Sequence, residues 1–204
     1  MHINSGEVIM LLKWLYKSYS RHGWNVLTYL LSKLCIRGSR RVTWLRLCGM
    51  EIGEGSEINC GIDAFPEPYM VSIGKKVYIA GNAVFMTHDG ALSWMSRAMG
   101  YTDKRTDKMG TITVKDNCFI GARALIMQNV TIGSNCIVGM GSIVTKDVPD
   151  HSVVAGVPAK VICTTEQYLE KHKDRDDYTC GWPYDKKRAY YEKKYHMHIT
   201  TEKA

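Results

Sequence analysis

A six-residue repeat of β-branched aliphatic side chains constrains the fold of this chain more than any other feature. Every sixth residue from position 114 belongs to it: Val114, Ile120, Ile126, Ile132, Val138 and Val144. An α-helix repeats about every 3.6 residues and an amphipathic strand about every 2, so neither fits a period of six. The period fits a solenoid of short strands joined by tight turns. Three hexads, or 18 residues, would make one triangular coil.

Small residues follow the same period and favour the same fold. Four places after each aliphatic stand Cys118, Ala124, Val130, Cys136, Ser142 and Val148. We expect the aliphatic to fill the core at each corner and the small residue to let the chain turn. Glycines or other small polar residues would supply the turns. Cys118 and Cys136 would stack in one interior column as packing residues.

Breaks in the register locate two insertions. From Ile58 to Ile73 the repeat slips by three residues, and from Phe85 to Val114 it slips by five. The second slip predicts a loop of about residues 86–111 that leaves the coil, and a long ordered excursion is often functional. The repeat domain spans 51–163.

The flanking segments have helical patterns instead. Residues 1–50 predict a basic, amphipathic helical cap, with apolar residues at helical spacing in Val8–Leu15 and Val26–Leu34. Residues 164–204 predict a charged, partly helical tail. We therefore expect an all-β solenoid between two helical appendages.

Charge and cysteine content exclude several classes of protein. The net charge of +7 comes from 1–50, which holds eight Lys/Arg against Glu7. No nucleic-acid recognition motif accompanies it. We expect the basic segment either to cap the first coil or to make peripheral contact with a membrane. Seven cysteines without CxxC spacing argue against disulfides and zinc ribbons, and predict a cytoplasmic protein with no metal. Its basic N-terminal segment would allow contact with the inner face of the membrane.

The run IGARALIMQNVTIGSNCIVGMGSIVTKDVPDHSVVAGVPAKVI, residues 120–162, resembles the hexapeptide-repeat O-acetyltransferases, among them the galactoside, maltose and capsular-polysaccharide enzymes. The segment YMVSIGKKVYIAGNAVFMTHDGA, 69–91, looks like the subgroup that acetylates surface-polysaccharide sugars. The resemblance implies a left-handed parallel β-helix. It also implies an enzyme that transfers acetyl from acetyl-CoA to a hydroxyl of a sugar or a polysaccharide precursor.

The resemblance assigns catalysis to His88 as the general base, at the mouth of the extended loop. Imidazole is largely neutral at neutral pH and can accept the proton of a hydroxyl. Asp89 would orient the ring or bind the acceptor, although neighbours in an extended chain point to opposite faces. Asn59, Asp63 and Glu67 are expected acceptor contacts, and Asp63 and Glu67 could also reach His88.

The resemblance places coenzyme A along small turns of the coil. The expected donor-binding residues are Gly121, Ala122, Gly139, Met140, Thr145, Lys146 and Lys160. Lys160 takes the place of a basic residue, often arginine, that meets the phosphates. A lysine there is a point charge without the bidentate geometry of arginine.

The family forms homotrimers with the donor between adjacent subunits, so we expect a shared active site. The main alternative is an N-acetyltransferase acting on an amino sugar or an antibiotic. Long-chain acyl transfer, a nonenzymatic β-helix scaffold and a γ-type carbonic anhydrase are weaker alternatives. Only His88 and His151 fall within the repeat domain, whereas the carbonic anhydrase needs three histidines on zinc.

Overall fold

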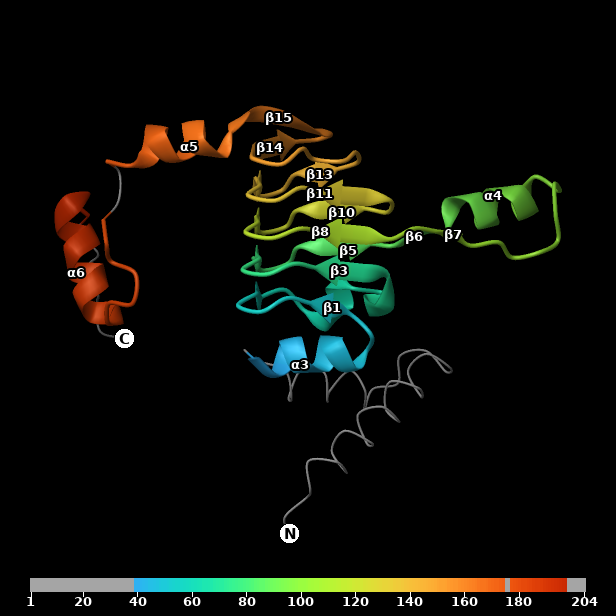
Figure 1. Ribbon diagram of the computed structural model, residues 1–204, viewed down its shortest axis with the longest axis horizontal. Coiled ribbons are helices and arrows are strands. Elements are labelled where there is room, and N and C mark those ends of the chain that lie inside the picture. The colour runs from blue at the N-terminus through green and yellow to red at the C-terminus, as the bar shows by residue number, and fades with distance from the viewer. Residues whose placement is uncertain (1–38, 175–176, 198–204) are drawn as a thin grey trace, which may run out of the picture. The chain divides into compact units, whose positions relative to one another are not determined.

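A computed structural model describes residues 39–174 and 177–197 (Figure 1). The helices predicted in Val8–Leu15 and Val26–Leu34 lie outside the described residues. The chain forms two compact units, Met1–Tyr168 and Leu169–Ala204. The first holds the repeat.

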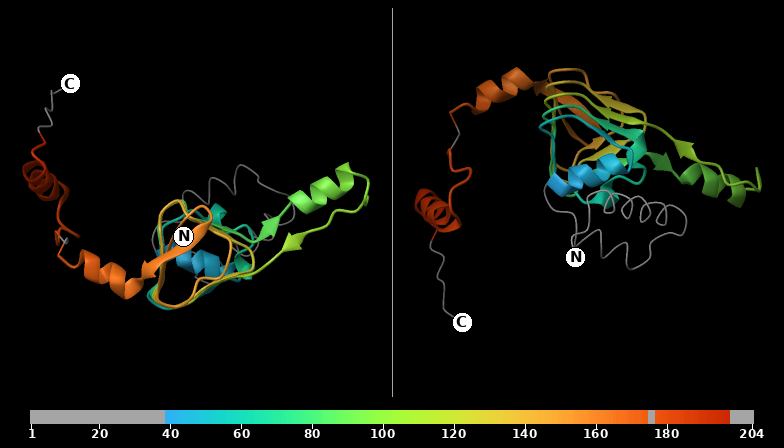
Figure 2. Two further views of the ribbon diagram at one scale, coloured as in Figure 1. Left: turned by 90° about the horizontal axis from the view of Figure 1, so that it is seen from above. Right: turned by 60° about the horizontal axis from the view of Figure 1, so that its bottom comes forward.

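Short strands stack into three sheets, one on each side of a coil, and all their strands except β15 (Ala159–Thr164) run parallel (Figures 1 and 2). Sheet A has the order β1-β3-β8-β11 and contains Glu51–Ile52, Val71–Ile73, Ile112–Val114 and Val130–Ile132. Sheet B contains β2, β4, β9, β12, β14 and β15, which are Glu57–Ile58, Tyr78–Ile79, Phe119–Ile120, Ile137–Val138, Ser152–Gly156 and Ala159–Thr164. Sheet C has the order β13-β10-β5 and contains Ile143–Val144, Leu125–Met127 and Val84–Met86.

The chain visits the sheets in the order A, B, C, so each coil has an A–B, a B–C and a C–A corner. Val114 pairs with Ile132, 18 residues later, which confirms a coil of three hexads. The six repeat aliphatics and the six small residues are all buried. The hydrophobic core therefore runs along the axis of the stack.

The remaining elements join or end the coils. They are α3 (Ser39–Leu47), η1 (Ile62–Ala64), η2 (Pro68–Met70), β6 (His88–Asp89), α4 (Ala91–Ala98), β7 (Lys108–Met109), α5 (Thr165–His172) and α6 (Tyr184–Lys194). Helix α3 closes the first coil, because Arg41 donates to Ile58 O (2.8 Å) and Arg46 to Ile52 O (2.7 Å). β15 runs antiparallel to β14 at the other end of the stack.

The turns meet the expectation of glycine or another small polar residue only in part. At the A–B corner, positive φ recurs at Gly55, Lys76, Asn117, Asn135 and His151, so mostly non-glycine residues adopt the left-handed conformation. Asparagine tolerates it because its short side chain bonds locally. The glycines that follow the repeat aliphatics have another role: a Cβ on Gly121 would lie 2.5 Å from Met140 N in the next coil.

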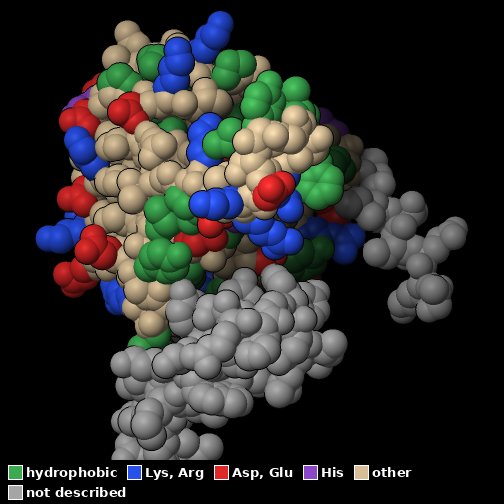
Figure 3. All heavy atoms as spheres, turned by 90° about the vertical axis from the view of Figure 1, so that its right-hand side faces the viewer, with side chains coloured by type: hydrophobic (Ala, Val, Ile, Leu, Met, Phe, Trp, Pro, Cys, Tyr) green, Lys and Arg blue, Asp and Glu red, His purple; other side chains and the backbone are tan. Residues whose placement is uncertain are grey.

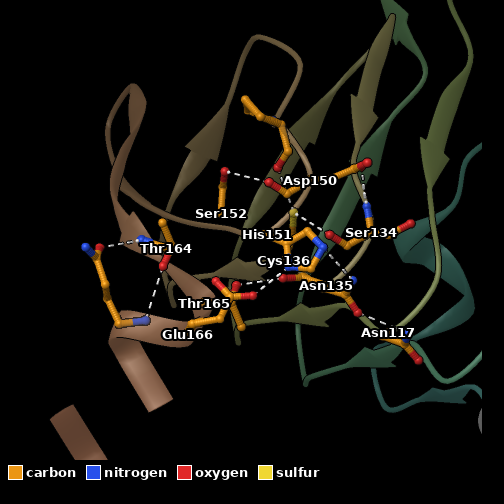
Figure 4. Close-up of polar contacts among 12 residues, drawn as sticks. Asn117, Ser134, Asn135, Cys136, Asp150, His151, Ser152, Thr164, Thr165 and Glu166 are labelled. Carbon is orange, nitrogen blue, oxygen red and sulfur yellow. Dashed lines mark hydrogen bonds and ion pairs between the residues drawn. The ribbon is translucent and has the colours of Figure 1, made fainter. Parts of the chain in front are cut away.

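A ladder of side chains runs along this corner and ends on α5 (Figure 4). Asn117 Nδ2 donates to Asn135 Oδ1 (3.1 Å), and Asn135 Nδ2 lies 3.2 Å from His151 Nε2. His151 Nδ1 lies 2.6 Å from Glu166 Oε1, and Thr165 Oγ1 donates to Asn135 O. The ladder therefore ties the first turn of α5 to the last coils.

The second unit is held by its own contacts. Tyr190 OH donates to Asp177 Oδ1 (3.0 Å), Lys194 pairs with the same carboxylate, and Trp182 packs edge-on against Tyr190. The Lys194 ammonium lowers the pKa of Asp177. None of the described helices has the length and apolarity needed to cross a bilayer.

Candidate active site

His88 lies where the chain leaves sheet C. Strand β5 ends at Met86, the fully buried Thr87 follows, and His88 begins the two-stranded ladder of β6 and β7. Gly110 N–H donates to Thr87 O (2.9 Å) where the returning segment rejoins the stack. The expected excursion therefore lies between β5 and β8, and His88 stands at its base. We call residues 90–109 the arm.

Glu67 holds the imidazole of His88. Its Oε2 lies 3.0 Å from His88 Nδ1 and also accepts a hydrogen bond from Thr87 Oγ1. An ionised carboxylate only accepts, so this contact assigns the proton to Nδ1 and leaves the lone pair on Nε2. The His88 side chain is 43% exposed and that of Glu67 is 21% exposed. The imidazole is thus fixed at one nitrogen and reachable at the other.

The insertion predicted from the slip between Ile58 and Ile73 positions Glu67. In place of a strand on the third side of the first coil, it forms η1 and η2. Phe65 is buried and stacks on Phe85 of β5, with ring centroids 4.8 Å apart. Pro68 on the other side of Glu67 is also buried. Two apolar anchors therefore bring the carboxylate from the first coil to the end of sheet C.

Asp89 has partners other than the ring. Its Oδ1 accepts the N–H of Ala91, the first residue of α4 (2.9 Å), and its Oδ2 lies 3.7 Å from Lys108 Nζ. Because consecutive residues of β6 point to opposite faces, the contact that orients His88 comes from Glu67 instead. A role of Asp89 in binding the acceptor stays a prediction.

The other expected acceptor contacts lie on the same insertion. Asn59 is exposed directly after β2, where its N–H donates to Ile79 O (2.8 Å), and Asp63 is exposed in η1. Glu67, predicted to contact the acceptor, is already bonded to Thr87 and His88. Among the described residues, Asn59 and Asp63 make no comparable hydrogen bond to His88.

Sequence reasoning missed Gln128. Its Oε1 is buried without a hydrogen-bond partner among the described residues. Met127 pairs with Met86 across sheet C, so Gln128 lies one coil above Thr87. An unsatisfied buried oxygen costs about 1–3 kcal/mol of folding free energy. The Gln128 Oε1 is therefore a hydrogen-bond acceptor without a partner among the described residues, one coil from Thr87 of the Thr87–Glu67–His88 cluster. Only the strand register could have indicated this.

Four of the expected donor-binding residues share the B–C corner. Gly121 and Ala122 follow β9, and Gly139 and Met140 follow β12, one coil later. Gly141 N–H donates to Ala122 O (2.9 Å), and Met140 is 80% exposed. These turns are therefore stacked closely, and the Met140 side chain projects outward from the second of them.

The other three lie elsewhere. Thr145 and Lys146 are exposed after β13, at the C–A corner that also carries His88 two coils away. Lys160 is exposed on β15 opposite Ala155. Within one chain, the turns at the B–C corner precede the sheet C strands and His88 follows them. The structure does not bring Gly121, Ala122, Gly139 or Met140 to His88 of the same chain.

In the part of the chain that the structure describes, no three His, Cys, Asp or Glu side chains come together as metal ligands.

Comparison with known proteins gives this arrangement a family. The family model described as the hexapeptide repeat of succinyl-transferase matches residues 111–146. Protein CapG of Staphylococcus aureus is 44% identical over 124 residues, which are 61% of this chain and 70% of CapG. A 2,3,4,5-tetrahydropyridine-2,6-dicarboxylate N-acetyltransferase of Lacticaseibacillus paracasei is 59% identical over 63 residues, 31% of this chain and 26% of that enzyme.

A solved structure agrees in fold. The hexapeptide-repeat acetyltransferase of Vibrio cholerae O1 biovar eltor, in complex with acetyl coenzyme A, superposes with a TM-score of 0.52 at 20% identity. It covers 80% of this chain and 93% of its own. Its likeness supports the assignment of the stack as a left-handed parallel β-helix. On the extent of the match to CapG and on this fold, the chain belongs to the hexapeptide-repeat acetyltransferase family.

Proposed function

We propose that this enzyme transfers acetyl from acetyl-CoA to a hydroxyl of a sugar or a surface-polysaccharide precursor, with His88 as the general base. The observation that carries the proposal is the 3.0 Å contact between His88 Nδ1 and Glu67 Oε2, which leaves Nε2 available as a base. The ring is partly exposed at the point where the coil opens into the arm.

The reaction follows from that geometry. Nε2 takes the proton of the acceptor hydroxyl while its oxygen attacks the thioester carbonyl. The tetrahedral intermediate then collapses, the C–S bond breaks, and the imidazolium returns its proton to the departing thiolate. Glu67 stabilises the imidazolium in between, as a carboxylate does in a catalytic triad. A base of this kind contributes about 10²–10⁴-fold in rate.

Acetyl-CoA is the donor that the family implies, and the Vibrio cholerae neighbour was solved with it. The closely stacked turns at Gly121–Ala122 and Gly139–Met140 would hold the pantetheine arm through backbone groups. Lys146 and Lys160 are exposed cations suited to the phosphates. Thr145 would be a further contact with the bound acetyl-CoA.

The acceptor would approach from the side of the first insertion, where Asn59 and Asp63 are exposed beside the Glu67 segment. Asp89 follows His88 in β6 at the base of the arm. An amine acceptor is the second candidate, since the Lacticaseibacillus paracasei relative is an N-acetyltransferase. That match spans about a quarter of the relative, so the hydroxyl acceptor remains our first proposal.

We also propose a homotrimer with shared sites. The outward side chains of sheet C are all apolar and only partly exposed: Val84, Met86, Leu125, Met127 and Ile143. The corresponding positions of sheet A are polar, with Ser72, Thr113 and Thr131. A subunit contact over sheet C could bring the B–C corner of one chain to His88 of another.

The first experiment measures thiol release from acetyl-CoA with a panel of sugar and amino-sugar acceptors, using the full chain and His88→Ala. We expect acceptor-dependent release that the variant loses by about 10²-fold or more. A variant that retains more than a tenth of the activity would exclude His88 as the base. Preference for amines would favour the second candidate.

The second experiment tests sharing. Met140→Glu places a carboxylate in the donor track at an exposed position, and His88→Ala removes the base. Co-expressed chains of the two variants should regain activity that neither has alone, because some mixed trimers contain an intact site. Complete lack of complementation, or a stable monomer in light scattering, would contradict the shared site.

A further inference from the structure

Thr87 is the last buried side chain before the arm, and it is polar. Along the run from β5 into β6, Phe85 and Thr87 are fully buried, whereas Met86 and His88 are partly exposed. Side chains alternate between the two faces of an extended chain, so the inward direction set by Phe85 continues to Thr87 after the strand ends. A hydroxyl group therefore lies inside the repeat domain, one residue before the proposed base.

The partner of this hydroxyl distinguishes Thr87 from the other buried polar side chains. Among the described residues, these others are Ser142, Ser152 and Thr179. Ser142 and Ser152 bond to backbone groups, and Thr179 bonds to another hydroxyl. Thr87 Oγ1 instead donates to a carboxylate oxygen, Glu67 Oε2. A hydrogen bond to an ionised group is stronger than one between neutral groups.

This contact is also shielded from water. Charged side chains of both signs lie on the surface around the end of the arm (Figure 3), where solvent weakens their interactions. Thr87 is fully buried, and the side chain of Glu67 is only 21% exposed. A hydrogen bond is stronger at the low dielectric of such a place, and a polar group left there without a partner is costly. The Thr87 hydroxyl is therefore a strong restraint on the Glu67 carboxylate.

One oxygen of Glu67 serves both Thr87 and His88, since Oε2 also lies 3.0 Å from His88 Nδ1. The buried Phe65 and Pro68 fix the backbone on either side of Glu67. They do not fix the carboxylate, because a glutamate side chain has several rotatable bonds. The β-branched side chain of Thr87 is stiff. Its hydroxyl thus gives the carboxylate a fixed point inside the protein.

We propose that Thr87 is a positioning residue that acts on His88 through Glu67; this inference rests on the function proposed above. The hydroxyl holds the carboxylate where it accepts the Nδ1–H of the imidazole. That contact keeps the lone pair on Nε2, where the acceptor hydroxyl is deprotonated. Without the Thr87 hydroxyl, Glu67 keeps its charge, loses a hydrogen-bond donor and turns from the ring toward water.

The experiment compares variants of the full chain. Thr87→Val keeps the branched shape and removes the hydroxyl, Thr87→Ala removes the hydroxyl in a second way, and Thr87→Ser keeps it. The matched control is Thr179→Val, the same substitution at a buried threonine whose hydroxyl has a neutral partner. Glu67→Gln and His88→Ala are measured in parallel. Melting temperatures show which variants are folded, and Thr87→Ala replaces Thr87→Val if the latter is not.

Steady-state kinetics should separate positioning from substrate binding. Thr87→Val should lower kcat by about tenfold while the KM for acetyl-CoA stays within about threefold, and Thr87→Ser should recover most of the loss. Thr179→Val should stay within about twofold of the wild type in both constants. In the Glu67→Gln background, Thr87→Val should lower kcat no further. The acidic limb of the pH–rate profile should move toward lower pH in both Thr87→Val and Glu67→Gln, because the imidazolium loses its carboxylate.

Nitrogen-15 NMR of the histidine-labelled chain measures the positioning without any substrate. The signals of His88 are those missing from His88→Ala. Where the ring is neutral, Nδ1 should be protonated and Nε2 unprotonated, because Glu67 accepts from Nδ1. In Thr87→Val the shifts of the two nitrogens should approach one another as the tautomers mix, and Thr179→Val should leave them unchanged.

Either a single retained tautomer in Thr87→Val or a kcat within about threefold of the wild type would overturn the inference. A loss that multiplies with that of Glu67→Gln would also overturn it, and would give Thr87 a structural role only. If His88→Ala kept more than about a tenth of the activity, the proposed function would fail. The tautomer measurement would still decide whether Thr87 holds the ring through Glu67.

Discussion

His88 Nδ1 lies 3.0 Å from Glu67 Oε2 although 21 positions separate the two residues along the chain. Glu67 comes from the insertion of the first coil and His88 from the point where the second coil opens. The repeat is therefore interrupted at two places that lie close together in space. One interruption provides the Glu67 carboxylate, the other provides the His88 imidazole, and the two side chains are in contact. A regular coil could not do this, because it directs its side chains either into the core or outward from a flat sheet.

The first prediction concerns Asp89. Asp89→Asn should keep kcat within about threefold of the wild type, because an amide oxygen can still accept the Ala91 N–H beside α4. The matched comparison is Glu67→Gln, which changes the carboxylate that contacts the ring. Steady-state kinetics with acetyl-CoA and a competent acceptor decide this. A loss of kcat in Asp89→Asn as large as that in Glu67→Gln would restore Asp89 as the orienting acid.

The second prediction tests whether position 121 requires glycine because the next coil lies too close for a Cβ atom. In Gly121→Ala the new Cβ would lie 2.5 Å from Met140 N, whereas a Cβ on Gly81 meets nothing within 4 Å. Gly121→Ala should therefore cost about 1–3 kcal/mol of the free energy of unfolding, as overpacking does. Gly81→Ala should be neutral or slightly stabilising. Urea denaturation measures both, and equal effects would contradict the packing argument.

The third prediction concerns the buried thiols. Burial raises the pKa of Cys48 to about 12 and that of Cys60 to about 12. Both thiols should stay neutral and resist alkylation at neutral pH, while the exposed Cys180 reacts. Because the folded-state pKa is raised, the stability contributed by the neutral thiols is present below the ordinary value of 9.0 and lost as pH rises above it. Peptide mapping after alkylation checks the reactivity, and rapid native labelling of Cys60 would contradict it.

The fourth prediction concerns the end of the ladder at the A–B corner. The hydrogen bond from His151 lowers the pKa of Glu166. A lowered carboxyl pKa contributes stability above the ordinary value of 4.5, and this stability is lost as pH falls through the folded value. Glu166→Gln should thus melt at a slightly lower temperature than the wild type near neutral pH, and the two should converge in acid. A difference that persists unchanged in acid would contradict the pair's contribution.

The sequence predicted the core well and the turns less well. A column of aliphatics with period six can be buried only in a coil, so Ile120, Ile126 and Ile132 are where the repeat requires them. The turns were predicted to hold glycine or another small polar residue, because such residues tolerate positive φ. Asparagine meets that need at Asn117 and Asn135, and glycine is needed instead where the next coil approaches too closely for a Cβ.

The candidate site shows a different limit. The slip of register located the arm and drew attention to His88, but slips do not reveal which side chain an insertion brings to it. The Phe65–Phe85 stack decides that Glu67, rather than Asp63 or Asp89, reaches the ring. Gln128 gave no signal in the sequence, because its unsatisfied oxygen exists only once β5 and β10 are in register.

The most direct test of the account is a double-mutant cycle on His88 and Glu67. Rates of acetyl transfer are measured across pH for the wild type, Glu67→Gln, His88→Ala and the double variant, with Glu67→Asp as the conservative variant. If Glu67 acts by positioning His88, Glu67→Gln should lower kcat by at least about tenfold and alter the pH profile. Glu67→Asp should recover part of the loss, and Glu67→Gln should change nothing further once His88 is alanine. Losses that simply multiply in the double variant would show that Glu67 does not work through His88, and would contradict the account.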